Sequence, residues 1–290
     1  ALASWLSLTP AARWDRYETS IDDGSQPDLD HDRATYKGTV SVRPLAGLIV
    51  YASYGEAFRA PTVWELYQNY SLPTGFSNFR PNPGLRPESA DEIDLGLVHA
   101  TRGLFAADDS LTLRISGFRS HVQDLIALIT VGTFRNPFLG TRPILQYRNV
   151  SRARRRGVEA ELAYALGRFD LRTGYGRVRS IDRDTGASLF SPPDKLSFGL
   201  GLRLGSGARL GVTSSFVWAQ DYDTTVLRRR AAYDVHDVFL TLTPARWPVR
   251  VDLGVSNVFD RRYALYREST VTPDTYEEGR SARIALSTRY

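Results

Sequence analysis

The chain has 290 residues, of which 42% are hydrophobic, 11% aromatic and 24% charged, with a formal net charge of +5. The aromatic content excludes a disordered chain, and no apolar run approaches the ~20 residues that a membrane-spanning helix needs. Cysteine is absent, which excludes disulfides, thiolate metal sites and thiol nucleophiles. The positive charge is almost all arginine and is spread among 32 acidic residues, so we predict no nucleic-acid partner.

The beginning of the chain indicates processing or a missing N-terminal part. Methionine is absent throughout, and the sequence opens with Ala1-Leu2-Ala3. Residues 1–9 alternate between apolar and polar, unlike the charged and apolar regions of a secretory signal. We therefore expect a processed chain or the C-terminal part of a longer protein.

Apolar residues recur with a period of two from one end of the chain to the other, which predicts β-strands. The pattern is clean where Leu196, Phe198, Leu200, Leu202 and Leu204 alternate with smaller or polar residues. No segment shows the 3.6-residue period of a helix. The pattern predicts about twelve strands, near 5–16, 34–44, 47–56, 90–99, 110–121, 158–166, 168–179, 196–204, 208–220, 233–243, 249–256 and 283–290.

The connections between these strands alternate in length. Short or medium ones are expected at 44–47, 101–109, 167–169, 205–208 and 244–248, and long ones at 18–33, 57–88, 123–148, 180–194, 221–232 and 259–279. Outer-membrane barrels have short turns at one end and long loops at the other. The chain is therefore predicted to be all-β, an antiparallel transmembrane β-barrel with an even number of strands.

A soluble all-β sandwich also has alternating strands. Two features favour the membrane barrel, since a wet lumen accepts charged side chains and membrane interfaces favour aromatic ones. Full charges lie within the expected strands at Glu92, Asp94, Glu159, Glu161, Arg250 and Asp252. Aromatic residues lie near strand ends at Trp5, Trp14, Tyr17, Tyr51, Tyr54, Trp218, Tyr222 and Tyr233.

Two proline-containing boxes flank the segment 62–81. The first is Phe58-Arg59-Ala60-Pro61, and the second is Asn82-Pro83-Gly84-Leu85-Arg86-Pro87-Glu88. Pro61 removes a backbone donor, so the strand before it must leave the sheet there. Pro83 and Pro87 hold the returning chain extended until the next strand starts near Glu88. On residue chemistry alone, we expect these boxes to serve barrel architecture.

These boxes resemble those of TonB-dependent outer-membrane receptors, and three later segments extend the resemblance over nearly the whole chain. They are Asn149-Val150-Ser151-Arg152-Ala153 with Gly157-Val158-Glu159, then Asn257-Val258-Phe259-Asp260 with Tyr263, and Gly279-Arg280 opening a last strand that ends at Tyr290. The resemblance implies outer-membrane localisation in a Gram-negative cell and transport without catalysis. No catalytic motif such as GxSxG, HExxH or a P-loop is present.

The resemblance also implies a longer protein. Such receptors are barrels of about 22 strands closed by a plug domain. Residues 1–290 would then be a partial barrel domain, with the C-terminal ~12 strands, and the plug, the TonB-contacting segment and the first strands would precede Ala1. Extracellular loops, mainly 57–88, would capture an iron-containing ligand, and TonB would supply the energy for import.

The order of the boxes most resembles the haem and haemoprotein receptor branch, in which a histidine between the boxes is expected to bind haem iron. Val63 to Pro81 holds no histidine. A tyrosine phenolate can also bind ferric haem, so Tyr67 and Tyr70 are the candidate iron ligands, with His31 as a weaker metal candidate. The predicted ligand-binding residues are Arg59, Tyr67, Tyr70, Phe76, Phe79 and Arg80. A ferric siderophore is the second candidate ligand, and cobalamin and other receptors share the boxes.

Two arginine groups stand out at the expected long-loop end: Arg152, Arg154, Arg155 and Arg156, and Arg228, Arg229 and Arg230. Arginine binds phosphate bidentately, so lipopolysaccharide of the outer membrane is a predicted partner of these residues. The alternatives are attraction of an anionic ligand and a solvated charged loop. A passive porin-like channel of about twelve strands is the alternative function for the chain as a whole.

Overall fold

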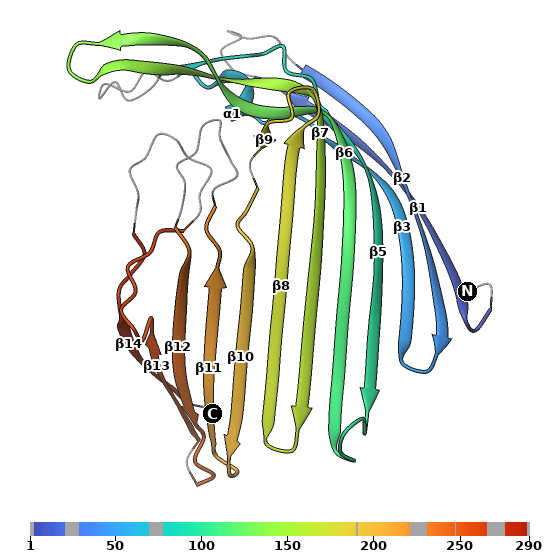
Figure 1. Ribbon diagram of the computed structural model, residues 1–290, viewed down its shortest axis with the longest axis vertical. Coiled ribbons are helices and arrows are strands. Elements are labelled where there is room, and N and C mark those ends of the chain that lie inside the picture. Colours follow the sequence, from blue (N-terminus) through green and yellow to red (C-terminus); the bar gives the residue numbers. More distant parts are fainter. Residues whose placement is uncertain are drawn as a thin grey trace.

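The computed structural model describes residues 3–20, 29–69, 78–189, 191–220, 231–246, 248–265 and 276–288. It forms one fourteen-stranded sheet and one short helix (Figure 1). The elements are β1 (Leu6–Thr19), β2 (Leu29–Leu45), β3 (Leu48–Arg59), α1 (Val63–Tyr67), β4 (Asn78–Arg80), β5 (Glu88–Arg102), β6 (Asp109–Asn136), β7 (Gly140–Leu166), β8 (Phe169–Asp182), β9 (Ser188–Leu189), β10 (Lys195–Leu204), β11 (Ala208–Val217), β12 (Tyr233–Leu242), β13 (Val249–Ser256) and β14 (Ser281–Thr288).

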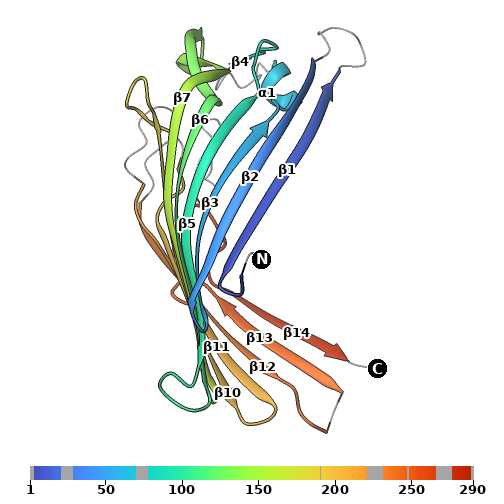
Figure 2. The same cartoon turned by 90° about the vertical axis from the view of Figure 1, so that its right-hand side faces the viewer.

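Twelve of these strands follow one another as an antiparallel meander, in the order β1-β2-β3-β5-β6-β7-β8-β10-β11-β12-β13-β14. β4 pairs with β7 in parallel, and β9 pairs with β8, so both lie off the main path. The sheet is strongly curved, and among the described strands β1 and β14 form its two margins (Figure 2). The all-β antiparallel prediction and the twelve consecutive strands are confirmed.

The two faces of the sheet differ in chemistry because side chains alternate along each strand. On one face Val50 lies opposite Leu97, which lies opposite Ile115 on the next strand. Many large apolar side chains on this face are exposed, including Leu95 at 57%. On the other face Glu92 lies opposite Ser120, which lies opposite Arg155. An exposed apolar face suits lipid and the polar face suits a lumen.

The short turns lie together at one end of the sheet, the lower edge in Figure 1. Glycines with positive φ occupy them, at Gly47, Gly103, Gly167 and Gly205. Asp109, which is 2% exposed, accepts backbone hydrogen bonds from residues 104–106 at 2.7–3.0 Å and a bond from the Tyr164 hydroxyl. The strands at this end are therefore joined by short, tight turns, as the alternation of connection lengths predicts.

The long-loop end differs from the expectation at 123–148, which was predicted to be a loop. β6 and β7 continue through this segment as a hairpin, which bends over the end of the sheet (Figure 1). The turn is tight, because the Asn136 side chain accepts hydrogen bonds from the backbone amides of Phe138 and Leu139. The expectation at 18–33 is also partly wrong, since β2 already begins at Leu29. Among the described residues, no helix is both long and apolar enough to cross a membrane.

Candidate functional site

The segment between the two boxes is held at its base by one arginine. Arg59 ends β3 and donates to Glu88 at the start of β5, at 2.8 and 2.7 Å. The same guanidinium donates to Glu65 of α1 at 2.8 and 3.1 Å. Each carboxylate side chain is only 14% exposed. We call Arg59, Glu65 and Glu88 the clamp, because charge-assisted bonds of this kind fix planar groups in one geometry.

Helix α1 begins where the sequence provides a reciprocal cap. Thr62 accepts from the amide of Glu65, and the Glu65 carboxylate accepts from the amide of Thr62. Burial raises the pKa of Glu65, but its bonds from Arg59 and Thr62 outweigh burial, so the net pKa lies below the ordinary value. The carboxylate is thus held ionised inside the clamp.

The second box attaches the segment to the β6–β7 hairpin. Asn82 donates from its side chain to the carbonyl of Tyr147 at 2.9 Å and from its backbone to the carbonyl of Leu66 at 2.7 Å. The side chain of Asn149 accepts from the amide of Arg86 and donates to its carbonyl, both at 2.8 Å. Glu88 accepts a further bond from the amide of Ile126. The boxes therefore use their polar groups to position backbone.

A small apolar core lies under this segment. Leu66, Leu85 and Ile126 are buried together, and Tyr67 and Tyr147 pack against them. Phe79 in β4, 8% exposed, pairs with Leu145 of β7. These contacts hold α1 and β4 against the hairpin, so the described part of the 57–88 segment is a fixed platform.

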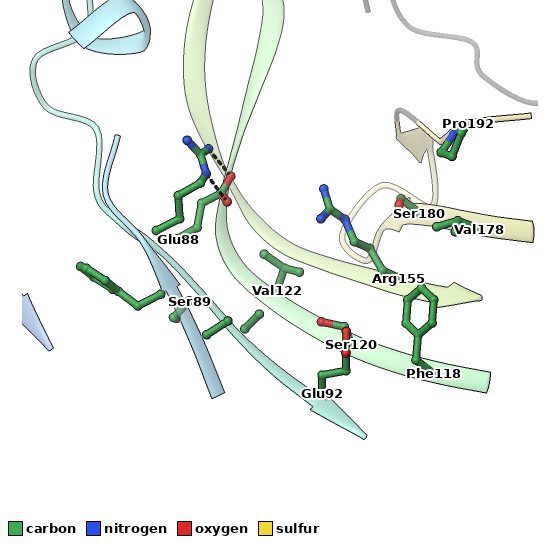
Figure 3. A pocket seen from close by; sticks show the side chains of 14 residues that line it. Glu88, Ser89, Glu92, Phe118, Ser120, Val122, Arg155, Val178, Ser180 and Pro192 are labelled. Carbon is green, nitrogen blue, oxygen red and sulfur yellow. Dashed lines mark hydrogen bonds and ion pairs between the residues drawn. The ribbon is translucent and has the colours of Figure 1, made fainter. Parts of the chain in front are cut away.

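A hollow of about 520 Å³ lies below the clamp on the polar face. Arg59, Glu88, Glu92, Ser120 and Arg155 are among its lining residues, and Figure 3 shows the last four of them. Phe118, Val122 and Val178 supply apolar walls. This mixture of charged groups and apolar walls can accommodate an amphiphilic anion or cation.

The structure places the predicted ligand-binding residues in different settings. Arg59 is committed to two carboxylates, and Phe79 is buried in the core beneath the platform. Tyr67 is partly buried against that core, whereas Arg80 is exposed. Tyr70 and Phe76 lie outside the described residues. Arg80 is therefore the predicted residue whose side chain is most available to a ligand among those described.

His31 lies in β2, not in a loop. Its neighbours Asp30 and Asp32 point to the opposite face, where they accept bonds from Arg16 and Trp14. Among the described residues, no group of three or more histidine or acidic side chains could hold a metal ion. The part of the chain that the structure describes thus places His31 in no such group.

The later boxes are also built into the fold. Asn257 and Asp260 adopt positive φ of 51° and 54°, which asparagine and aspartate tolerate. Asn257 bonds to the backbone amide and carbonyl of Arg261, and the rings of Phe259 and His236 pack in a T shape with their centroids 5.2 Å apart. A Cβ at Gly157 would lie 2.3 Å from the Phe118 ring and 2.8 Å from the carbonyl of Arg177.

Two features of the structure escape the sequence analysis. Trp64 on α1 is 62% exposed and lies between the boxes. The sequence could have indicated it, because an aromatic residue in an expected ligand loop is a candidate contact. Ser214 contacts His236 at 2.8 Å, and His236 contacts Asp234 at 2.9 Å. This Ser-His-Asp contact lies on the apolar face and joins β11 to β12, and only strand register reveals it.

The sequence matches the family described as "TonB dependent receptor-like, beta-barrel" over residues 2–258. The chain belongs to this family. Its members are transporters of the Gram-negative outer membrane and not enzymes, so the predictions of family, localisation and absence of catalysis are confirmed. Glu159, on the polar face opposite Ser116, accordingly lies on the lumen side of the barrel wall.

Relatives agree with this assignment. The chain is 29% identical over 275 residues to the "Heme/hemopexin utilization protein C" of Haemophilus influenzae (strain 86-028NP), covering 89% of this chain and 38% of the relative. It is 27% identical over 296 residues to the "Hemin receptor" of Yersinia enterocolitica, covering 97% and 42%. The chain thus spans about two fifths of the length of these relatives.

Solved structures share the fold. The "Copper transporter OprC" superposes with a TM-score of 0.79 at 21% identity, covering 99% of this chain and 45% of the other. The Serratia marcescens "hemophore receptor HasR in complex with its hemophore HasA and heme" superposes with a TM-score of 0.69 at 20% identity, covering 99% and 49%. At this identity the likeness concerns the barrel and not the ligand.

Proposed function

We propose that this chain forms the C-terminal part of a receptor that captures an iron-containing ligand at its long-loop end and imports it with energy supplied through TonB. Haem, free or carried by a protein, is the first candidate. The platform between the boxes carries the proposal, because it presents Trp64 and Arg80 at the long-loop end, above a hollow on the polar face. An aromatic plane and a cation suit a porphyrin and its propionates.

The margins of the sheet support the wider proposal of a larger barrel. Among the described strands, β1 and β14 each have one neighbour, and lipid does not tolerate open sheet edges. We propose that further strands close the barrel to a total of about 22, with a plug domain in its lumen. The polar face described here would then line the wall around that plug.

Growth on haemin as the sole iron source tests the function in cells with and without TonB. We expect growth to need both the receptor and TonB. Growth without TonB would overturn energised import and favour the passive channel. Growth on a ferric siderophore but not on haemin would overturn the haem assignment.

The iron ligand is tested separately by the Soret absorbance of the complete receptor with haemin. We propose Tyr67 or Tyr70 as the ligand, so Tyr67→Phe or Tyr70→Phe should shift the spectrum. Haemin binding like wild type by both single variants and by the double variant would refute a tyrosine ligand. The absence of histidine from 63–81 favours a ferric siderophore as the second candidate.

A further inference from the structure

The run Arg154-Arg155-Arg156 is divided between the two faces of the sheet. Arg155 lies opposite Ser120 and lines the hollow on the polar face. Arg154 and Arg156 point to the opposite face, because side chains alternate along β7. The three arginines therefore belong to different environments, although they adjoin in sequence.

The strand register places further arginines beside Arg154 and Arg156. Arg156 lies opposite Arg119 of β6 and Arg179 of β8, and Arg177 lies one row below on β8. Neighbouring strands are about 4.8 Å apart and successive rows on one face about 7 Å apart. We call Arg119, Arg154, Arg156, Arg177 and Arg179 the outer arginine cluster. Neighbouring members are close enough to share a phosphate group.

This cluster lies where the exposed apolar residues end. Arg119 is opposite Ile93, which is 54% exposed, and Arg177 is opposite Val158, which is 47% exposed. Below them on the same face, Leu97, Ile115 and Ala160 continue the apolar surface toward the short turns. The arginines therefore lie on the lipid-facing side, at the depth of headgroups and toward the long-loop end.

Acidic residues neutralise only part of this charge. Asp194 lies 2.6 Å from Arg179 and 3.8 Å from Arg177. Asp91, on the same face, contacts His121 at 3.2 Å. Within the described residues, Arg119, Arg154 and Arg156 make no ion pair. Three adjacent cations facing lipid headgroups favour an anion from the membrane itself.

We propose that the outer arginine cluster binds the phosphate groups of lipid A, the phosphorylated glycolipid of the outer leaflet. Guanidinium groups bind phosphate oxygens through paired N–H donors and are weakly hydrated, which suits a site at the edge of lipid. The imported ligand would use the polar face, so this site is separate from import and does not rest on the haem assignment. It gives the barrel a fixed lipid contact at its outer rim.

The test compares Arg154→Gln/Arg156→Gln with the control Arg155→Gln, which removes a neighbouring charge from the other face. The complete receptor is purified in detergent, and native mass spectrometry measures binding of diphosphoryl lipid A. We expect the double variant to bind about tenfold more weakly, because each lost charge-assisted bond is strong, and the control to bind like wild type. Equal loss in both variants, or loss in neither, would overturn the site.

Two further arms use the wild-type receptor, so the test does not depend on the variants folding. Enzymatically dephosphorylated lipid A should bind as weakly to wild type as the diphosphoryl form does to the double variant. Inorganic phosphate at millimolar concentration should leave lipid A binding unchanged. Binding that ignores the lipid phosphates would overturn phosphate recognition, and displacement by inorganic phosphate would indicate a site for free anions instead.

Discussion

Replacing Arg59 with methionine tests whether the clamp holds the platform. The substitution preserves most of the apolar stem but removes the guanidinium that donates to Glu65 and Glu88 at 2.7–3.1 Å. Two carboxylates that are each 14% exposed would then face one another without a cation. In Arg59→Met we expect α1 and the start of β5 to separate from the β6–β7 hairpin more often than in wild type.

The structure bounds the size of this effect. Leaving a buried charge without its partner costs about 3–5 kcal/mol. The Arg59 side chain is 42% exposed, so water replaces part of what it provides. We therefore expect Arg59→Met to destabilise the platform locally by about 2 kcal/mol, which raises the population of its open state about thirtyfold.

Amide hydrogen exchange in the complete receptor measures this opening, read in peptides covering 62–69 and 122–128. The control is Arg114→Met, because Arg114 and Glu161 form an exposed pair at 3.4 Å that contributes less than about 0.5 kcal/mol. Adding Glu65→Gln and Glu88→Gln to Arg59→Met should restore part of the protection, since it removes the unpaired charges. Unchanged exchange in Arg59→Met, or no recovery in the triple variant, would refute this account of the clamp.

Three further predictions concern the clamp, the barrel wall and a short turn. Because the folded pKa of Glu65 lies below its ordinary 4.5, its stabilisation is present above that value and is lost as pH falls through the lowered pKa. Exchange protection at 62–69, corrected for intrinsic rates, should hold from pH 8 to pH 5 and fall below about 4.5, whereas Glu65→Gln should flatten the profile. Gly157→Ala would press on the Phe118 ring and a backbone carbonyl, at a cost of about 1–3 kcal/mol, whereas Gly254→Ala meets nothing within 4 Å; equal thermal unfolding of the two variants would contradict this steric reasoning. Asp109→Ala leaves three backbone amides without their acceptor and should lower barrel stability by about 1–3 kcal/mol, which denaturant unfolding monitored by circular dichroism would detect.

The strands were predictable where alternation runs without interruption. The pattern at 196–204 predicts a strand that the structure has at Lys195–Leu204, and the pattern at 249–256 coincides with β13. In such strands one face meets lipid and the other a wet lumen, so the sequence records the period directly. The short turns were predictable for a related reason, since glycine with positive φ marks them.

The outer half of the β6–β7 hairpin was not predictable in this way. Asp124 adopts a positive φ of 56°, and the register shifts between Thr130 and Gly132. Each irregularity disturbs the alternation, so a paired strand resembles an aperiodic loop. Pro143 within β7 also favours a loop when the sequence is considered alone. A proline is tolerated there because β8 does not pair with this part of β7.

The candidate site was predictable in its motifs but not in its contacts. Arg59 and Glu88 were singled out from the boxes, yet the second partner of Arg59, Glu65, and the amide of Ile126 that donates to Glu88 follow only from the fold. The outward and inward arginines of β7 were also indistinguishable before strand register assigned them to faces. Local sequence determines which strand a residue joins, whereas its neighbours across the sheet come from distant segments.

The motifs and the ligand site are different parts of the same segment. Asn82 and Asn149 bond to backbone groups, Glu88 bonds to Arg59 and to the amide of Ile126, and Leu85 is buried beneath the platform. A group that is already satisfied inside the fold has little left to offer a ligand, so the boxes can serve receptors with unrelated cargo. We therefore propose that specificity depends on side chains that the platform exposes, such as Trp64. The family is therefore recognised from residues that build the platform, while we expect the choice of cargo to depend on those that the platform displays.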